Sequence, residues 1–242
     1  MKKLVLSFAI ALLVAASTHA QTTYDFTTGS SWSFTNLTVN GSNLDFTASG
    51  ASSGSATFLG SAPFNSNWSA QVTVFLNPTL STPSVQPPEL ASLGLTVAGN
   101  GKTASITLAN SQPPSPAPLT HDIASSIYPA NATPVSASST ATLKFTYSYN
   151  GGVSPTLSTY YGTTQLQSAD LTTWGMTTSD TFGFTLFGDT SSGVTATAGQ
   201  AYFSNFQGTG LSLSAIPEPS TWATITGFAA LCFAIYRRRR HA

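Results

Sequence analysis

Apolar and polar residues alternate along much of the chain, and this alternation constrains the fold more than any other feature of the sequence. Residues 68–76 (WSAQVTVFL) have an apolar side chain at every second position, and the same period recurs at 93–97, 104–108, 141–149 and 182–186. A period of two belongs to a β-strand with one buried face. Between residues 21 and 215, Ser, Thr, Gly, Val, Phe and Tyr are common while Lys, Glu and Arg are nearly absent, which disfavours helices.

Turn-forming sequences separate these segments. Gly99-Asn100-Gly101 joins the runs at 93–97 and 104–108, and Asn150-Gly151-Gly152 follows the run at 141–149. Asn and Gly accept the positive φ of tight turns, so both sites predict antiparallel hairpins. Further strands are expected at Tyr24, 32–39, 44–46, 56–59, 157–161 and 201–206.

The resulting count of about ten or eleven short strands predicts an all-β fold, an antiparallel β-sandwich of the jelly-roll type. Two proline-rich stretches, residues 82–88 and 112–134, interrupt the strands and predict surface loops, because proline cannot pair inside a sheet.

The order of elements in the second half is similar to that of concanavalin A-like lectins and glucanases. The resemblance covers roughly Leu143 to Phe206 and rests on a long Thr/Phe/Tyr strand, an Asn-Gly turn, Tyr160-Tyr161-Gly162, Phe182-Gly183-Phe184 and Tyr202-Phe203-Ser204-Asn205-Phe206. It implies a concanavalin A-like sandwich.

The N-terminus has the three parts of a secretory signal peptide. Met1-Lys2-Lys3 is positively charged, Leu4 to Ala16 is apolar, and Thr18-His19-Ala20 offers a small-residue cleavage site. We expect residues 1–20 to direct the chain to the Sec translocon and residues 21–212 to form one β-sandwich domain. Cys232 is the only cysteine, so that domain folds without disulfides.

Residues 213–242 form a tripartite tail. An extended turn comes first, at Pro217, Glu218, Pro219 and Ser220. An apolar run with Trp222 near its start and Tyr236 at its end predicts a single transmembrane helix with aromatic residues at the membrane interfaces. A stop-transfer cluster closes it, at Arg237, Arg238, Arg239 and Arg240.

This tail resembles the PEP-CTERM sorting signal of exopolysaccharide-producing Gram-negative bacteria. The resemblance implies that exosortase processes the protein near Pro217-Glu218-Pro219, after a transient stay in the inner membrane, and passes it to the cell surface or the extracellular space. The alternative is a plain tail anchor, which would explain the arginines but not the Pro-Glu-Pro turn.

The charge of the central region excludes nucleic acid as a partner. Between Gln21 and Ala215 only Lys102 and Lys144 are basic, against seven acidic residues, which gives a net charge of about −5. Phosphate binding needs clustered Lys and Arg. The acidic residues are Asp25, Asp45, Glu89, Asp122, Asp170, Asp180 and Asp189.

No catalytic constellation is visible in the sequence. His121 is the only histidine between the two targeting segments, and no Gly-x-Ser-x-Gly motif accompanies it. Glycoside hydrolysis needs two carboxylates about 5–9 Å apart, and no two acids share a strand at a suitable spacing. We therefore expect a protein that is not an enzyme, without a transition metal. The oxygen-rich segment Asp189-Thr190-Ser191-Ser192-Gly193 leaves a calcium ion open as an alternative.

Trp174, Tyr160 and Tyr161 are candidates for stacking on sugar rings, with core or edge packing as the alternative for each. The main hypothesis is an exported surface or matrix protein, structural or adhesive in exopolysaccharide or biofilm. Two alternatives are a carbohydrate-binding, lectin-like module and a glycan-active enzyme that would assemble its acids from distant strands.

Overall fold

The computed structural model describes residues 20–27, 31–80, 90–111 and 120–213. The chain divides into two units, Met1–Ser212 and Leu213–Ala242, and the sandwich belongs to the first. The predicted signal peptide, apart from Ala20, and the predicted sorting tail, apart from Leu213, lie outside the described residues. Within the described ranges, no helix has the length and apolarity needed to cross a membrane.

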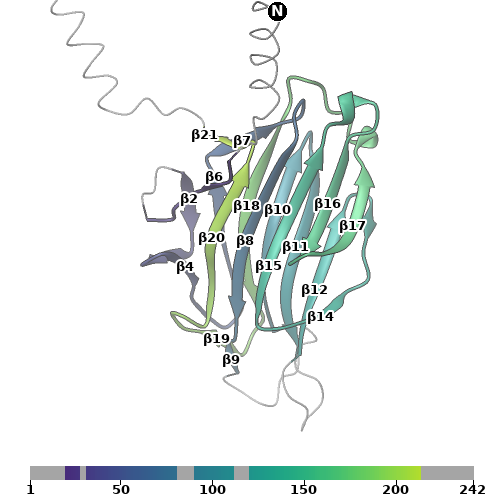
Figure 1. Ribbon diagram of the computed structural model, residues 1–242. Helices are drawn as coiled ribbons and strands as arrows, with labels where there is room; N and C mark the ends of the chain where they lie inside the picture. Colours follow the sequence, from purple (N-terminus) through teal and green to yellow (C-terminus); the bar gives the residue numbers. More distant parts are fainter. Residues whose placement is uncertain (1–19, 28–30, 81–89, 112–119, 214–242) are drawn as a thin grey trace, which may run out of the picture. The chain divides into compact units, whose positions relative to one another are not determined.

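The first layer is an eight-stranded antiparallel sheet (Figure 1). In order across the sheet its strands are β17 (Thr164–Asp170), β16 (Thr156–Tyr161), β15 (Thr140–Ser148), β8 (Trp68–Leu76), β20 (Ala201–Thr209), β4 (Asn43–Phe46) and β3 (Leu37–Asn40), with β1 (Thr22–Thr23) also beside β20.

The second layer is a ten-stranded antiparallel sheet. Its strands in order are β13 (Ala130–Asn131), β12 (Thr120–Ile127), β11 (Lys102–Ser111), β10 (Ala91–Gly99), β18 (Thr181–Thr190), β6 (Ser52–Phe58) and β2 (Trp32–Thr35), with β14 (Val135–Ala137), β7 (Gly60–Pro63) and β21 (Ser212–Leu213) off this path. A small third sheet and two 3₁₀ turns complete the described part: β5 (Ala48–Ser49), β19 (Val194–Ala196), β9 (Thr79–Leu80), η1 (Asn150–Gly152) and η2 (Thr172–Trp174).

The core lies between the two large sheets and follows from the alternation in the sequence. Every second residue of β8, beginning with Trp68 at 3% exposed, is buried. Aromatic rings of the two sheets meet there: Trp68 lies 5.2 Å from Phe184 edge to face, and Tyr147 lies 4.9 Å from Phe182. Such contacts add to the burial of apolar area. The predicted antiparallel sandwich is confirmed.

Both predicted hairpins are present. Gly99 pairs with Lys102, and the two residues between them, Asn100 and Gly101, have φ of 46° and 71°. Positive φ at both central positions is what a tight two-residue hairpin requires. The Asn150–Gly152 turn connects β15 to β16, where Ser148 pairs with Thr156.

One loop prediction is wrong. Residues 112–134 were expected to form a loop, but Thr120–Ile127 is strand β12 and pairs with β11 along its whole length. The reason is that proline is absent from 120 to 128. Ile123, Ser125 and Ile127 are buried at alternate positions in this strand. His121 therefore belongs to β12, where its Nε2 lies 2.9 Å from the carbonyl oxygen of Leu76.

Candidate functional site

The outer face of the ten-stranded sheet, meaning the side turned away from the eight-stranded sheet, is an ordered array of small polar side chains. Strand register places them in rows that cross β6, β18, β10 and β11. The rows are Ser53, Asp189, Ser92 and Ala109; then Ser55, Phe187, Gly94 and Thr107; then Thr57, Thr185, Thr96 and Ser105. Phe187 is the one aromatic residue in the three rows, and most of its neighbours there are serine and threonine side chains.

Phe187 lies across the backbone of Gly94 on the neighbouring strand. A Cβ atom placed on Gly94 would overlap the Cε1 and Cζ atoms of the Phe187 ring. The absence of a side chain at Gly94 is thus what lets the ring settle onto the sheet. Phe187 remains half-buried. The result is a partly exposed apolar surface with hydroxyl groups on both sides.

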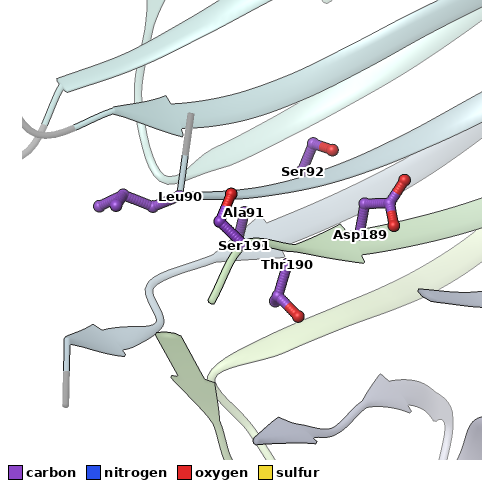
Figure 2. Close-up of a pocket in the computed structure, with 6 residues that line it drawn as sticks. All are labelled: Leu90, Ala91, Ser92, Asp189, Thr190 and Ser191. Carbon is purple, nitrogen blue, oxygen red and sulfur yellow. The ribbon is translucent and has the colours of Figure 1, made fainter. Parts of the chain in front are cut away.

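A pocket of about 270 Å³ lies where the start of β10 meets the end of β18, one row of residues along the sheet from Phe187. Figure 2 shows that Ser92 and Asp189 project from the same side of these strands, while Thr190 projects from the other. Asp189 is exposed and Ser92 is only 5% exposed. Thr190 instead donates its hydroxyl hydrogen to the carbonyl oxygen of Gly50 at 2.8 Å. The remaining lining residues are Leu90, Ala91 and Ser191.

Asn110 fixes the backbone that forms this pocket. Its side-chain Oδ1 accepts a hydrogen bond from the backbone N–H of Ala91 at 2.9 Å, and its own carbonyl oxygen accepts one from Leu90 at 2.9 Å. Ser191 N–H then donates to the carbonyl oxygen of Leu90, also at 2.9 Å. Asn110 is fully buried, so these bonds are shielded from water and keep the end of β10 in place.

A second pocket, of about 360 Å³, lies across β11 and β12 on the same sheet. Its lining residues are Ser105, Thr107, Ala124, Ser125, Ser126, Asn131, Ala132 and Pro134. The segment after β12 forms one wall, and Ala132 N–H bonds back to the carbonyl oxygen of Ser125 at 2.8 Å. Thr107, which lines this pocket, pairs with Gly94 in the same row as Phe187, and Ser92 of the first pocket lies in the next row. Phe187 itself lines neither pocket.

A hydrogen-bond network that runs from a buried pair to the surface joins that wall to the eight-stranded sheet. Ser125 Oγ lies 2.7 Å from Thr159 Oγ1 and donates to Gln167 Oε1 at 3.2 Å. Gln167 Nε2 donates in turn to the carbonyl oxygen of Ala130 at 3.0 Å. Strands β16 and β17 of one sheet thereby position the edge of the other.

The structure does not bring the predicted stacking residues together. Trp174 is 1% exposed, and its Nε1 donates to the carbonyl oxygen of Tyr128 at 3.2 Å. It therefore packs in the core, which was the alternative to stacking on a sugar. Tyr160 lies on the outer face of the eight-stranded sheet, half-buried, with its hydroxyl donating to Gln165 Oε1 at 3.2 Å. Tyr161 pairs with Leu143 and packs against the core. The predicted sorting motif (217–220), the predicted ends of the transmembrane helix (222 and 236) and the arginine cluster (237–240) lie outside the described part.

The carboxylates are spread over the domain. Asp25 Oδ1 and Asp170 Oδ1 accept hydrogen bonds from Thr27 N–H and Thr172 N–H at 2.8 and 2.7 Å. In both cases hydrogen bonds to the threonine two residues on lower the pKa of the carboxyl. Asp180 Oδ2 accepts from Thr177 N–H at 2.6 Å. Each of these three carboxylates accepts a backbone N–H from a residue two or three positions away, whereas Asp189 lies within β18.

Asp122 and Asp189 lie on the same outer face but far apart. Strands β10 and β11 separate them, because Asp189 pairs with Ser92, Ser92 with Ala109, and Ala109 with Asp122. Three strand spacings of about 4.8 Å place them roughly 14 Å apart, beyond the separation of a catalytic carboxylate pair. Glu89 lies outside the described residues. The described residues also contain no cluster of three or more His, Cys, Asp or Glu that could hold a metal ion.

Comparison with solved structures relates this fold to lectins. No family model matches the sequence, and no curated protein matches it. The lectin from Bauhinia forficata in complex with GalNAc has a TM-score of 0.54 at 11% identity, over 81% of this chain and 99% of that chain. The Emp47p carbohydrate recognition domain has a TM-score of 0.48 at 10% identity, over 80% and 96%. The first likeness shows that the described part of the chain has a lectin-like β-sandwich fold, in agreement with the resemblance noted for residues 143–206.

Proposed function

We propose that this protein is an exported, lectin-like carbohydrate-binding module that binds glycan on the outer face of its ten-stranded sheet. The observation that carries the proposal is the Phe187 ring packed on Gly94, in the row of residues between Ser92 and Asp189, which line one pocket, and Ser105, which lines the other. A sugar ring has an apolar C–H face and a rim of hydroxyls. An aromatic surface bordered by serine, threonine and aspartate matches both parts.

The shared fold of a lectin that was solved with GalNAc supports this proposal over a purely structural role. The two are compatible, because a glycan-binding module at the cell surface would retain exopolysaccharide. In that reading the PEP-CTERM-like tail delivers the module to the envelope, and exosortase and the Sec translocon are its partners during export.

The proposal is tested on a glycan array with the purified full chain and two variants. Phe187→Ala removes the stacking surface and should weaken binding about tenfold, as expected for the loss of one aromatic contact. Phe75→Ala is the matched control, since Phe75 is a half-buried phenylalanine on the outer face of the other sheet, paired with Tyr202. Binding equally weakened in both variants, or an array on which the unmodified chain binds nothing, would overturn the proposal.

A further inference from the structure

The pocket at Ser92 and Asp189 presents two polar groups that the described protein residues do not engage. Within the described part of the chain, neither the carboxylate of Asp189 nor the hydroxyl of Ser92 has a hydrogen-bond or ion-pair partner. Ser92 is only 5% exposed and lines the pocket, and Asp189 is exposed. The Ser92 hydroxyl is not among the sealed, unpartnered polar atoms of the described residues, so it stays reachable from the pocket. Both groups are therefore free to bond a ligand there.

The two groups are placed to act on one ligand atom. Ser92 and Asp189 are direct cross-strand partners, which puts their Cβ atoms about 5 Å apart. The carboxylate offers only acceptors, and the hydroxyl offers two acceptor positions besides its donor. A group with several hydrogens to donate satisfies both oxygens at once. An ammonium carries three donors and a positive charge.

The distribution of lysines in the described residues also favours a positively charged ligand at Asp189. The only lysines in the described part of the chain, Lys102 and Lys144, are engaged elsewhere: the Nζ of Lys102 lies 4.3 Å from the centre of the Tyr128 ring, and Lys144 lies on the eight-stranded sheet. Neither lysine of the described residues is therefore a counter-charge to the carboxylate of Asp189. Charge-assisted hydrogen bonds are about twice as strong as neutral ones.

Phe187 and Asp189 lie two residues apart on β18 and point to the same side, about 7 Å apart along the strand. We propose that this pocket binds the free amino group of an amino sugar whose ring stacks on Phe187. The site then favours polysaccharides with unsubstituted, protonated amino groups over their N-acetylated or uncharged counterparts. This inference rests on the proposed glycan-binding function and adds the class of sugar.

The test compares three oligosaccharides of equal length by calorimetry on the full chain: fully deacetylated chitosan, its N-acetylated form, and cello-oligosaccharide. At a pH where the amino groups are protonated, the deacetylated form should bind about tenfold more tightly, as for a hydrogen bond between charged groups. Asp189→Asn should abolish this preference. Asp122→Asn is the matched control and should retain it, because it lies beyond the screening length of about 10 Å at 0.1 M salt.

The outcomes separate the two proposals. Equal affinity for all three oligosaccharides, with binding still lost in Phe187→Ala, overturns the amino-sugar inference and leaves glycan binding in place. A preference that survives in Asp189→Asn also overturns the inference. Failure of all three to bind, together with an empty glycan array, overturns both.

Discussion

The hydroxyl of Tyr147 donates a hydrogen bond of 2.8 Å to the backbone carbonyl of Phe64, and both groups are buried. Tyr147→Phe keeps the ring and its contact with Trp68 but leaves this carbonyl without its donor. A buried carbonyl that loses its partner costs about 1–3 kcal/mol. We expect the free energy of unfolding to fall by this amount, measured by urea denaturation. An unchanged midpoint would show that the bond contributes nothing.

The same tyrosine predicts how stability depends on alkaline pH. Burial, with a smaller contribution from nearby Tyr149, raises the pKa of Tyr147 above its ordinary value of about 10. A raised pKa means that the folded state binds the proton more tightly, so this contribution is complete below pH ~10 and is lost as pH rises through the folded-state pKa. We expect unfolding midpoints to fall above pH ~10.

Tyr147→Phe should reduce this alkaline loss without removing it. Burial also raises the pKa of Tyr24, whose hydroxyl donates to the carbonyl oxygen of Leu211 at 3.1 Å. The measurement is the free energy of unfolding from neutral pH to above pH ~10 in both proteins. If the two curves run parallel throughout, the fall must come from other groups.

Gly94 should tolerate a methyl group far less well than Gly183, although both lie in the ten-stranded sheet. A Cβ on Gly94 would overlap the Phe187 ring and come within 2.9 Å of the carbonyl oxygen of Ile106, whereas a Cβ on Gly183 meets nothing within 4 Å. Overpacking costs about 1–3 kcal/mol, and an unobstructed Gly→Ala change in a strand stabilises by about 0.5–1 kcal/mol.

We therefore expect Gly94→Ala to lower the thermal midpoint and to displace Phe187, weakening glycan binding by about tenfold or more. Gly183→Ala should bind normally. Equal behaviour of the two variants in both measurements would mean that the ring does not depend on Gly94.

The buried pair Ser125 and Thr159 joins the two sheets and can be tested by a double-mutant cycle. Thr159→Val removes one hydroxyl while keeping the shape, and Ser125→Ala removes the other. Ser125→Ala leaves the buried Thr159 hydroxyl without its partner and should cost about 1–3 kcal/mol, whereas Thr159→Val leaves Ser125 its bond to Gln167 and should cost less. The double variant should lose less than the sum, with a coupling energy of about 0.5–3 kcal/mol. Simple additivity would show that the two hydroxyls act independently.

The strands that the sequence predicted are those with apolar residues at every second position. Strand β17 was missed, because its sequence TQLQSAD has almost no apolar residues and none of its side chains is fully buried. Strand β12 was missed because the prolines around it concealed a short alternating run. In both cases pairing with a neighbouring strand, β16 or β11, supplies the stability that local sequence does not.

The candidate site could not be predicted, for a related reason. Phe187 follows Leu186 in a run of mixed residues, and nothing local marks Gly94 as its neighbour. Only the register between β10 and β18 brings the two together. An alternating strand in which an aromatic residue occupies the polar side is a usable signal, since Phe187 breaks the polar set of β18 that includes Thr185 and Asp189.

The sorting prediction concerns residues outside the described part of the chain and can be tested by mass spectrometry of the surface fraction. If exosortase processes the tail, the C-terminus of the surface form lies close to Pro217 or Pro219. Replacing Glu218 by Ala should then leave the chain in the inner membrane with Arg237 to Arg240 attached, because four arginines cannot follow the helix across the bilayer at low cost. Lys102→Ala, within the sandwich, is the control and should be sorted normally. Recovery of intact Arg240 on the surface would contradict processing and leave the tail as a plain anchor.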